Sequence, residues 1–389
     1  MKNFDVIIIG AGPAGLGSAY NLAKKGIKVL VIEERQLGKT DKTWLTFLSV
    51  LKKYNLEENI VNRIDTLTFR SYLGGVYHLD GEITATIDEK KALKNLASQA
   101  VSNGAKINTR ESFVNYKYLQ GIIAINTSKE TYGAKLMIDA MGAESHILGS
   151  LGFSNPKVNM GCYACEVQGL KIPDRHKVII YDSFFPGNDY FWVVPQTNAR
   201  AIVGIFSFKT LNQITLVTAK RRLQKYMEVN KLNGRIVGIK KGNIPLGPQK
   251  YCSAERIISI GDSANTALPS SGFSFAACLK DSEILADFAE EYLDNKKEIS
   301  EYKADLLSTK LPGIEIHCLI SDLVVNFTDP LLNKAIAGME GQNKKFIQQF
   351  LTGDDMGIGF TTQAVKSILS IFNFNEIKRR QFSINNPAR

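Results

Sequence analysis

The chain has 389 residues, of which 44% are hydrophobic and 22% charged, which is the composition of a folded globular protein and not of a disordered one. No apolar run reaches the roughly 18 residues of a membrane-spanning helix, and no basic-then-apolar leader precedes Phe4, so we expect the first strand to belong to the fold. The formal net charge is +10, but the basic residues are scattered and no nucleic-acid motif accompanies them, which argues against nucleic-acid binding.

A strand, a glycine-rich turn and a helix are predicted for residues 6–26. The β-branched run over residues 6–9 is typical of a buried strand, and the helical pattern that follows ends at Gly26. Between them three glycines stand at the G-x-G-x-x-G spacing: the first permits a tight turn, the second lets a pyrophosphate approach the backbone, and the third lets helix and strand pack closely. The helix N-terminus offers N–H groups and a positive dipole end to a phosphate. The predicted phosphate-binding residues are Gly10, Gly12, Pro13, Ala14 and Gly15.

A second strand is predicted within residues 28–35, and it ends at an acidic residue. Glu33 follows Gly15 by eighteen positions, where a carboxylate accepts hydrogen bonds from the ribose of a bound dinucleotide. An acid here argues against a 2′-phosphate. The alternative is a plain glycine-rich turn beside an exposed glutamate. We predict a dinucleotide site to which Glu33, Glu34 and Arg35 contribute.

Two central segments carry a turn and a pair of cysteines. Residues 134–153 are predicted to form a strand, a turn shaped by Gly142, and a helix. The segment MGCYACEV (160–167) is predicted to be a strand, in which Cys162 and Cys165 point to opposite faces, so we expect buried thiols and no metal site. The five cysteines of the chain indicate a reducing compartment, and we expect a cytoplasmic protein without a disulfide framework.

A β-hairpin is predicted from two β-rich runs, 190–194 and 201–206, that are separated by turn-forming residues. Aromatic residues gather between Phe184 and Trp192, in greater number than a half-exposed hairpin needs. This clustering favours either an apolar ligand pocket or packing of the rings against the sheet, and the sequence leaves both open.

Residues 256–293 are predicted to form a strand, a turn, and a long amphipathic helix that begins at Gly272. Gly261 and Asp262 stand at the carboxyl end of the strand, where ligands bind in open α/β sheets. We therefore expect this turn to join the first glycine-rich turn around one cofactor. The helical stretches of residues 297–389 either cap the substrate cavity or close the core.

The segment GDSANTALPSSGFS (261–274) resembles the G-D-x-A-(x)n-P-x-x-G-x-[GS] motif of the flavoprotein superfamily that includes aromatic hydroxylases, geranylgeranyl reductases and lycopene cyclases. The resemblance implies FAD as the cofactor, with Asp262 at the ribityl chain and the following helix at the N1/C2 carbonyl edge of the flavin. The cofactor-binding residues that it adds are Gly261, Asp262, Pro269, Ser271, Gly272 and Phe273. The turn DAMGAES (139–145) is similar to another fingerprint of this superfamily, but Met141 stands where aromatic hydroxylases have an aspartate.

The same resemblance implies an α/β fold, in which a Rossmann-type FAD-binding domain is interleaved with a β-rich substrate domain, as in the aromatic hydroxylases. The expected FAD-binding domain is discontinuous and comprises residues 1–65, 90–152 and 252–296. The expected substrate domain comprises residues 66–89 and 153–251, followed by the helical C-terminal region 297–389.

The predicted hairpin resembles a geranylgeranyl reductase pattern, P-G-x-Y-x-W-x-F-P … N-V-G-x-G, which walls an isoprenoid cavity. This resemblance implies an FAD-dependent oxidoreductase that saturates C=C bonds of a geranylgeranyl-type chain by hydride transfer from reduced flavin. Tyr190 is expected near the reacting centre and Trp192 in the cavity wall. The cysteine that archaeal reductases carry near the flavin is absent from residues 38–50.

Two alternatives remain. Lycopene cyclases, which act without net redox change, are similar at KTW (42–44), GNIPLGP (242–248) and PSSGFSFAACL (269–279), but the strand AIVGIFSF lacks their paired glutamates. An FAD-dependent monooxygenase or halogenase is the other, and Met141 argues against it.

The implied partners are a hydrophobic isoprenoid or lipid substrate and an electron donor, either NAD(P)H or ferredoxin. A basic surface would attract anionic lipid headgroups or a pyrophosphate, so peripheral contact with a membrane stands beside the alternative of solvated lysines.

Overall fold

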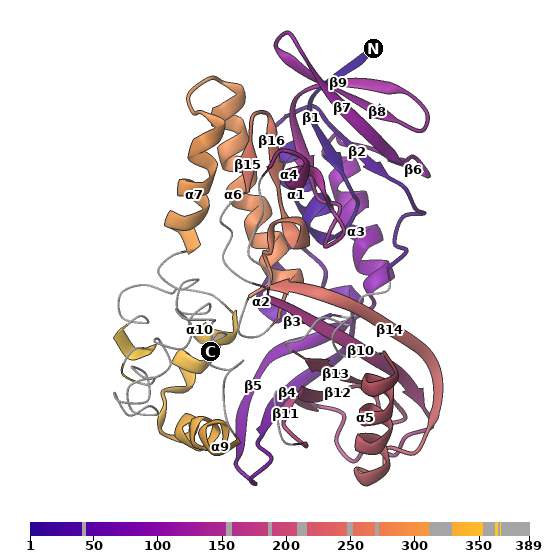
Figure 1. Cartoon of the computed structure of the whole chain (residues 1–389), viewed down its shortest axis with the longest axis vertical. Helices are drawn as coiled ribbons and strands as arrows, with labels where there is room; N and C mark the ends of the chain where they lie inside the picture. Colours follow the sequence, from indigo (N-terminus) through magenta and orange to yellow (C-terminus); the bar gives the residue numbers. More distant parts are fainter. Residues whose placement is uncertain are drawn as a thin grey trace, which may run out of the picture.

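The computed structural model describes residues 1–40, 44–152, 158–185, 189–207, 216–246, 252–268, 272–310, 329–352, 362–364 and 366. Within these residues two eight-stranded sheets lie one above the other in Figure 1, and helices pack beside each sheet. No helix in this described part is both long and apolar enough to cross a bilayer.

The first sheet has the order β15-β16-β9-β1-β2-β6, and β8 and β7 extend it by antiparallel pairing from β9. Its strands are β1 (Lys2–Ile9), β2 (Val29–Glu33), β6 (Lys106–Thr109), β7 (Phe113–Leu119), β8 (Ile122–Thr127), β9 (Thr131–Asp139), β15 (Ser253–Ala254) and β16 (Ile257–Ser259). The run from β16 to β6 is parallel. The carboxyl ends of these strands therefore meet at one edge, where the candidate site lies.

The apolar run of β1 is buried on both faces, as a central parallel strand requires. Val6 and Ile8 belong to the core formed with helices α1 (Pro13–Lys24), α3 (Glu89–Ser102) and α6 (Phe275–Leu293). Ile7 and Ile9 belong to a second core on the β8 side. The strand, turn and helix predicted for residues 6–26 are confirmed, and so is the second strand, which ends at Glu33.

The second sheet has the order β14-β10-β13-β12-β11-β4-β5-β3. Its strands are β3 (Leu45–Phe47), β4 (Ile60–Arg70), β5 (Val76–Ile87), β10 (Val158–Gln168), β11 (Lys177–Asp182), β12 (Asp189–Thr197), β13 (Arg200–Ser207) and β14 (Arg235–Leu246). Helix α5 (Leu216–Val229) covers one face, where Phe191 stacks on Tyr226 with 4.4 Å between ring centroids. The other face meets the main core and the candidate site.

The predicted hairpin is confirmed as β12 and β13, but its turn is tighter than expected. The strands pair up to Thr197 and Arg200, so only two residues connect them. Alternation along β12 divides the aromatic residues, because Tyr190 and Trp192 face the main core whereas Phe191 faces α5. The sequence left a ligand pocket and core packing open. Phe191 packs in the core beneath α5, and a ligand pocket on the other face of the strand stays a prediction.

The cysteine strand is confirmed as β10. Cys165 is buried in the cluster beneath α5, and Cys162 packs on the opposite face against the main core. The predicted start of the long helix at Gly272 is wrong by three residues, since α6 begins at Phe275. Gly272 has a φ of +71°, which lies in the left-handed region and cannot continue a right-handed helix.

The remaining elements are short helices and turns. They are α2 (Leu48–Lys53), α4 (Ile147–Ser150), α7 (Tyr302–Lys310), α9 (Asp329–Gly338), α10 (Lys344–Thr352), η1 (Glu57–Asn59), η2 (Gly261–Ala264), η3 (Ile299–Glu301) and η4 (Met339–Gly341). Helix α7 closes the core, because the ring of buried Tyr302 packs on Phe288 of α6, with 5.2 Å between the ring centroids. Helix α9 contacts the β4–β5 turn, where Asn333 accepts hydrogen bonds from the Ser71 hydroxyl and the Gly75 N–H.

The predicted domain boundaries can be set beside the two sheets. Strand β3 and the first residues of β4 pair in the second sheet, although residues 1–65 were expected in the FAD-binding domain. The division of the chain into domains stays a prediction.

Candidate active site

A pocket of about 540 Å³ lies at the carboxyl edge of the first sheet, above the glycine-rich turn. It collects residues from turns that follow β1, β2, β9 and β16, together with Lys241, Gly242 and Asn243 of β14. The sequence-predicted residues that line it are Gly10, Gly12, Pro13, Ala14, Glu33, Glu34, Arg35, Gly261 and Asp262.

The three glycines of the turn have different surroundings. A Cβ on Gly10, whose φ is +106°, would lie 2.4 Å from the Ala140 carbonyl oxygen, and a Cβ on Gly15 would lie 2.0 Å from the Gly10 carbonyl oxygen. A Cβ on Gly12 would meet no atom within 4 Å. Gly10 and Gly15 therefore serve close packing, whereas Gly12 keeps the backbone open toward the pocket. This is the arrangement that a pyrophosphate needs.

Helix α1 begins at this opening. Its N-cap residue, Gly12, makes no side-chain capping bond, and its first turn carries no acidic residue. The positive end of the helix dipole therefore faces the pocket without a competing carboxylate in that turn.

Glu33 is held at the end of β2 by the neighbouring backbone. One carboxylate oxygen accepts a hydrogen bond from the Ala11 N–H at 2.7 Å, and the other accepts one from the Arg35 N–H at 2.8 Å. A carboxylate has about four acceptor positions, so these bonds fix its orientation and leave capacity for a hydroxyl in the pocket. The glutamate is 9% exposed, which argues against the alternative of a glycine-rich turn beside an exposed glutamate.

The aspartate turn packs directly on the glycine turn. Gly261 has a φ of +71°, and a Cβ there would lie 2.8 Å from the Cβ of Ala14. Two segments that are about 250 positions apart in the sequence therefore form adjacent walls of one pocket.

Asp139 is a structural carboxylate that sequence reasoning did not select. It is buried at the end of β9, where it accepts hydrogen bonds from the hydroxyls of Ser145 (2.7 Å), Ser259 (2.8 Å) and Ser263 (3.2 Å) and from the Met141 N–H (3.2 Å). Burial raises the pKa of Asp139, and these hydrogen bonds act in the opposite direction. The network fixes the 140–144 turn against the pocket. The DAMGAES segment was the available signal, but nothing local marks the two serines near residue 260.

A second, smaller pocket of about 160 Å³ adjoins the first on the side of the second sheet. Its lining is mostly apolar and consists of Trp44, Leu45, Met160, Cys162, Ile180, Trp192, Val194, Phe206, Ile244, Asp262, Gly272, Phe273 and Ser274. Three of these residues, Trp44, Asp262 and Ser274, also line the larger pocket. The two pockets therefore share a wall at these residues.

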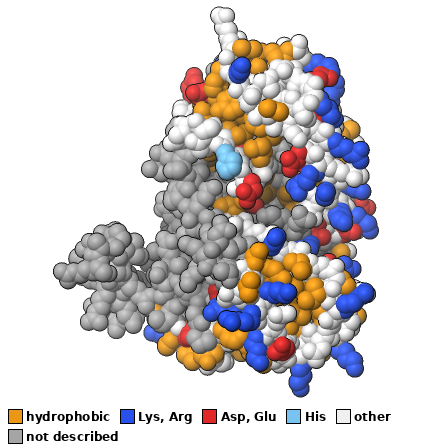
Figure 2. Space-filling view, turned by 45° about the vertical axis from the view of Figure 1, so that its right-hand side comes forward, with side chains coloured by type: hydrophobic (Ala, Val, Ile, Leu, Met, Phe, Trp, Pro, Cys, Tyr) orange, Lys and Arg blue, Asp and Glu red, His pale blue; other side chains and the backbone are white. Residues whose placement is uncertain are grey.

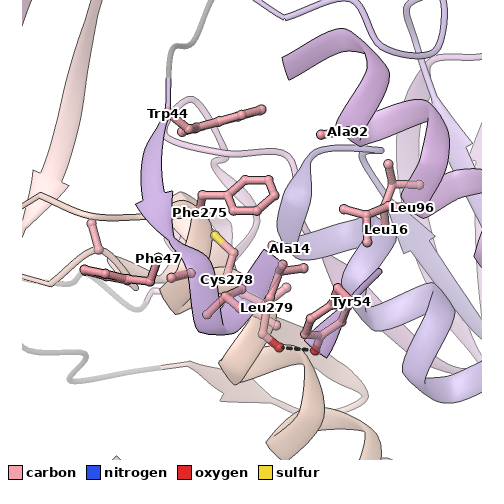
Figure 3. Packing of buried hydrophobic residues seen from close by; sticks show 14 of the residues in the cluster. Ala14, Leu16, Trp44, Phe47, Tyr54, Ala92, Leu96, Phe275, Cys278 and Leu279 are labelled. Carbon is pink, nitrogen blue, oxygen red and sulfur yellow. Dashed lines mark hydrogen bonds between the residues drawn. The ribbon is translucent and has the colours of Figure 1, made fainter. Parts of the chain in front are cut away.

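Aromatic packing shapes this junction. Figure 3 shows Trp44 beside Phe275, with 5.1 Å between their ring centroids, and shows Cys278 and Ala14 close below. The ring centroids of Phe47 and Phe273 lie 5.0 Å apart in an edge-on arrangement. These rings connect β3 to the start of α6 and hold the junction in place.

The two predicted substrate residues have different positions. Trp192 lines the smaller pocket, and its indole lies directly over Gly204 of β13, where a Cβ would come within 2.2 Å of the ring. Tyr190 is fully buried behind the pocket wall, 5.5 Å from the ring of Phe206, and burial with the nearby Asp329 carboxylate raises its pKa. The wall position of Trp192 is observed, whereas a catalytic role for either residue stays a prediction.

The remaining predicted residues lie elsewhere. Gly272 and Phe273 line the smaller pocket, and Gly15 supports the turn from behind. Pro269 and Ser271 lie outside the described residues, as does the start of the reductase-like pattern, residues 186–188. Cys162 is a pocket residue that sequence reasoning assigned to burial alone.

Comparison with known proteins identifies relatives and solved structures that share this architecture. The chain is 26% identical over 375 residues to digeranylgeranylglycerophospholipid reductase 3 of Methanosphaera stadtmanae, covering 88% of this chain and 92% of that protein. It is 24% identical to the digeranylgeranylglycerophospholipid reductase of Methanococcus vannielii, over 77% of this chain and 80% of the relative.

Two solved structures have the same fold. A geranylgeranyl bacteriochlorophyll reductase-like protein from Thermoplasma acidophilum superposes with a TM-score of 0.81 at 18% identity, covering 97% of this chain and 99% of that one. A flavin-dependent brominase superposes with a TM-score of 0.81 at 14% identity, covering 97% and 100%. The predicted fold class is thereby confirmed. The profile of the lycopene cyclase protein family matches residues 5–313, and the chain belongs to that family.

Proposed function

We propose that the chain is an FAD-dependent oxidoreductase that saturates C=C bonds of an isoprenoid chain. The observation that carries this proposal is the pair of joined pockets, one built on the glycine-rich turn and one lined mostly by apolar side chains, with a shared wall at Trp44, Asp262 and Ser274. A two-part cofactor and an apolar substrate would meet at that wall.

The residues of the larger pocket fit the ADP half of FAD. Gly12 leaves room for the pyrophosphate beside the N-terminus of α1, and Glu33 is oriented to accept hydrogen bonds from the ribose. Asp262, at the shared wall, would hold the ribityl hydroxyls. When reduced, FAD would supply a hydride to one carbon of the alkene, and an acid would protonate the other carbon.

The chain itself would contribute orientation and exclusion of water. An isolated alkene is a poor hydride acceptor, so a fixed geometry and a dry cavity must provide much of the rate enhancement. Trp192, Phe206 and Phe273 provide such apolar walls. The two reductases named above act on a lipid with geranylgeranyl chains, which supports an isoprenoid lipid as the substrate class.

The proposal is tested by the mass of the product. Purified protein with dithionite-reduced FAD is incubated without oxygen with a detergent-dispersed geranylgeranyl lipid, and we expect the product to gain two hydrogens for each bond reduced. The same incubation with oxidised FAD is the control. A substrate that is recovered unchanged with reduced FAD would overturn the assignment.

A cyclase or isomerase that acts without net redox change is the second candidate, because the chain belongs to the lycopene cyclase family. Such a reaction needs an acid to protonate the polyene. Among the described residues that line the smaller pocket, Asp262 is the only carboxylate, and β13 contributes apolar side chains. Cyclisation leaves the product mass unchanged, so the same measurement separates the two candidates.

A monooxygenase or halogenase would instead consume NAD(P)H and oxygen in the presence of an aromatic substrate. Met141, which lines the larger pocket at the position of the hydroxylase aspartate, argues against this activity. The electron donor of the reductase would be NAD(P)H or ferredoxin, and steady-state reduction of the bound flavin by each distinguishes them.

A further inference from the structure

An exposed apolar surface covers the outer side of the second sheet, away from both pockets. It consists of the outward side of α5 and the first half of β14, and we call it the α5–β14 face. Its exposed hydrophobic residues are Leu216, Val217, Val229, Ile236, Val237 and Ile239. Three of them are more than half exposed, namely Val217 at 76%, Ile239 at 58% and Val229 at 51%.

These side chains are not required by the core. Helix α5 already packs on the sheet through Ala219, Leu223, Tyr226 and Met227, which are all buried. Strand β14 is an edge strand, and its register against β10 shifts between Glu166 and Val167, so the start of β14 bulges and exposes both Ile236 and Val237. An exposed hydrophobic cluster of this kind marks an interaction surface.

The same face is strongly basic. Residues 216–239 contain six lysines and arginines and one acidic residue, Glu228. Arg222 pairs with Asp189, and Lys225 lies 3.6 Å from Glu228. Within the part of the chain that the structure describes, Lys220, Arg221, Lys231 and Arg235 form no ion pair; these exposed residues leave the face with a positive surplus.

Figure 2 brings the right-hand side of Figure 1 forward and shows this part of the molecule. In its lower half, hydrophobic side chains gather in an area that has lysines and arginines within and around it, with few acidic side chains. A nucleic-acid surface would instead present stacking aromatic rings, but Tyr226 is the only aromatic residue of the 216–239 segment and it is buried. Apolar side chains inside a basic rim are complementary to the interface of a bilayer that carries anionic headgroups.

We propose that the α5–β14 face docks the protein on an anionic membrane surface. The inference rests on the proposed function to the extent that an isoprenoid lipid substrate would be drawn from a membrane. The aliphatic side chains would enter the headgroup region, and the lysines and arginines would contact lipid phosphates.

The test is flotation of the purified full-length chain with vesicles of phosphatidylcholine alone and of phosphatidylcholine mixed equally with phosphatidylglycerol. We expect binding to the anionic vesicles that weakens as NaCl is raised. The variant Lys220→Glu/Arg221→Glu is expected to lower the partition coefficient by about tenfold or more. The variant Val217→Ser/Ile239→Ser is expected to lower it at low salt as well, because the inserted apolar area is lost.

Matched controls lie on the opposite sheet, where β6 and β7 also expose cations and apolar side chains. Lys106→Glu/Lys117→Glu makes the same change in net charge, and Val114→Ser/Leu119→Ser removes similar exposed area. We expect both controls to bind vesicles like the parent chain. Failure of the parent chain to float, equal loss in docking and control variants, or equal binding to uncharged vesicles would overturn the proposal.

The product-mass assay separates this proposal from the proposed function. All four variants are assayed with detergent-dispersed substrate, where we expect them to retain the parent activity because none of the changed residues lines a pocket. A parent chain that reduces dispersed substrate but does not float would refute docking alone. One that floats through the α5–β14 face but reduces nothing would refute the reductase alone.

Discussion

The contact between Trp192 and Gly204 gives the most direct test of how the smaller pocket is built. A Cβ on Gly204 would come within 2.2 Å of the indole, far inside van der Waals contact. Gly204→Ala must therefore displace the ring, which we expect to cost about 1–3 kcal/mol of unfolding free energy. In the Trp192→Ala background the space is free, and the same substitution should be neutral or stabilise by about 0.5–1 kcal/mol, since alanine is better than glycine inside a strand.

The coupling is measured as a double-mutant cycle by urea unfolding. Gly238→Ala is the matched control, because a Cβ at that β14 position would have an ordinary contact with Glu166 at 3.4 Å. The indole lines the smaller pocket, so its displacement by Gly204→Ala should also change the pocket wall and raise KM for the isoprenoid substrate. Equal costs of Gly204→Ala in both backgrounds would refute the reasoning.

Three further predictions concern the larger pocket. Gly12→Ala should leave the midpoint of urea unfolding nearly unchanged but weaken FAD binding in a fluorescence titration. Gly15→Ala should destabilise the apoprotein, because its Cβ would lie 2.0 Å from the Gly10 carbonyl oxygen. The reverse pattern would contradict the roles assigned to the two glycines. Glu33→Gln removes one of two charge-assisted acceptors for backbone N–H groups and should weaken FAD binding by about tenfold or more in the same titration, with exposed Glu34→Gln as the milder control. Burial raises the pKa of Asp139, so the contribution of this residue to stability is present at low pH and is lost as pH rises through the raised pKa. The unfolding free energy of the parent chain relative to Asp139→Asn should therefore fall with rising pH. A difference that is flat or rises would be inconsistent with the raised pKa.

The features predictable from the sequence are those set by local chemistry. The β-branched run, the glycine spacing and Glu33 identified β1, α1 and β2, because backbone freedom and burial act within a few residues. The hairpin was also predictable from the sequence, but the predicted turn was too long. The strands continue past Pro195 to Thr197 and Arg200, with a register shift after Pro195.

The features that were missed depend on long-range packing. The hydroxyls that hold Asp139 come partly from Ser259 and Ser263, about 120 positions away, and no local pattern marks them. Likewise, the position of Cys162 in the smaller pocket depends on which face of β10 meets the core, and strand periodicity alone does not decide this. Helix α6 begins later than predicted because Gly272 has a left-handed conformation. A glycine allows this conformation, but its presence in the sequence does not predict it.

The close packing of Gly261 on Ala14 has a consequence for biosynthesis. The larger pocket has its glycine turn near the beginning of the chain, but its facing wall is translated only some 250 residues later. A nascent chain would therefore possess β1, α1 and β2 long before it possesses a closed ligand site. Any dinucleotide that requires both walls must join a polypeptide of which about two thirds has already been made, and it can stabilise the assembled fold without guiding the earliest steps of its formation.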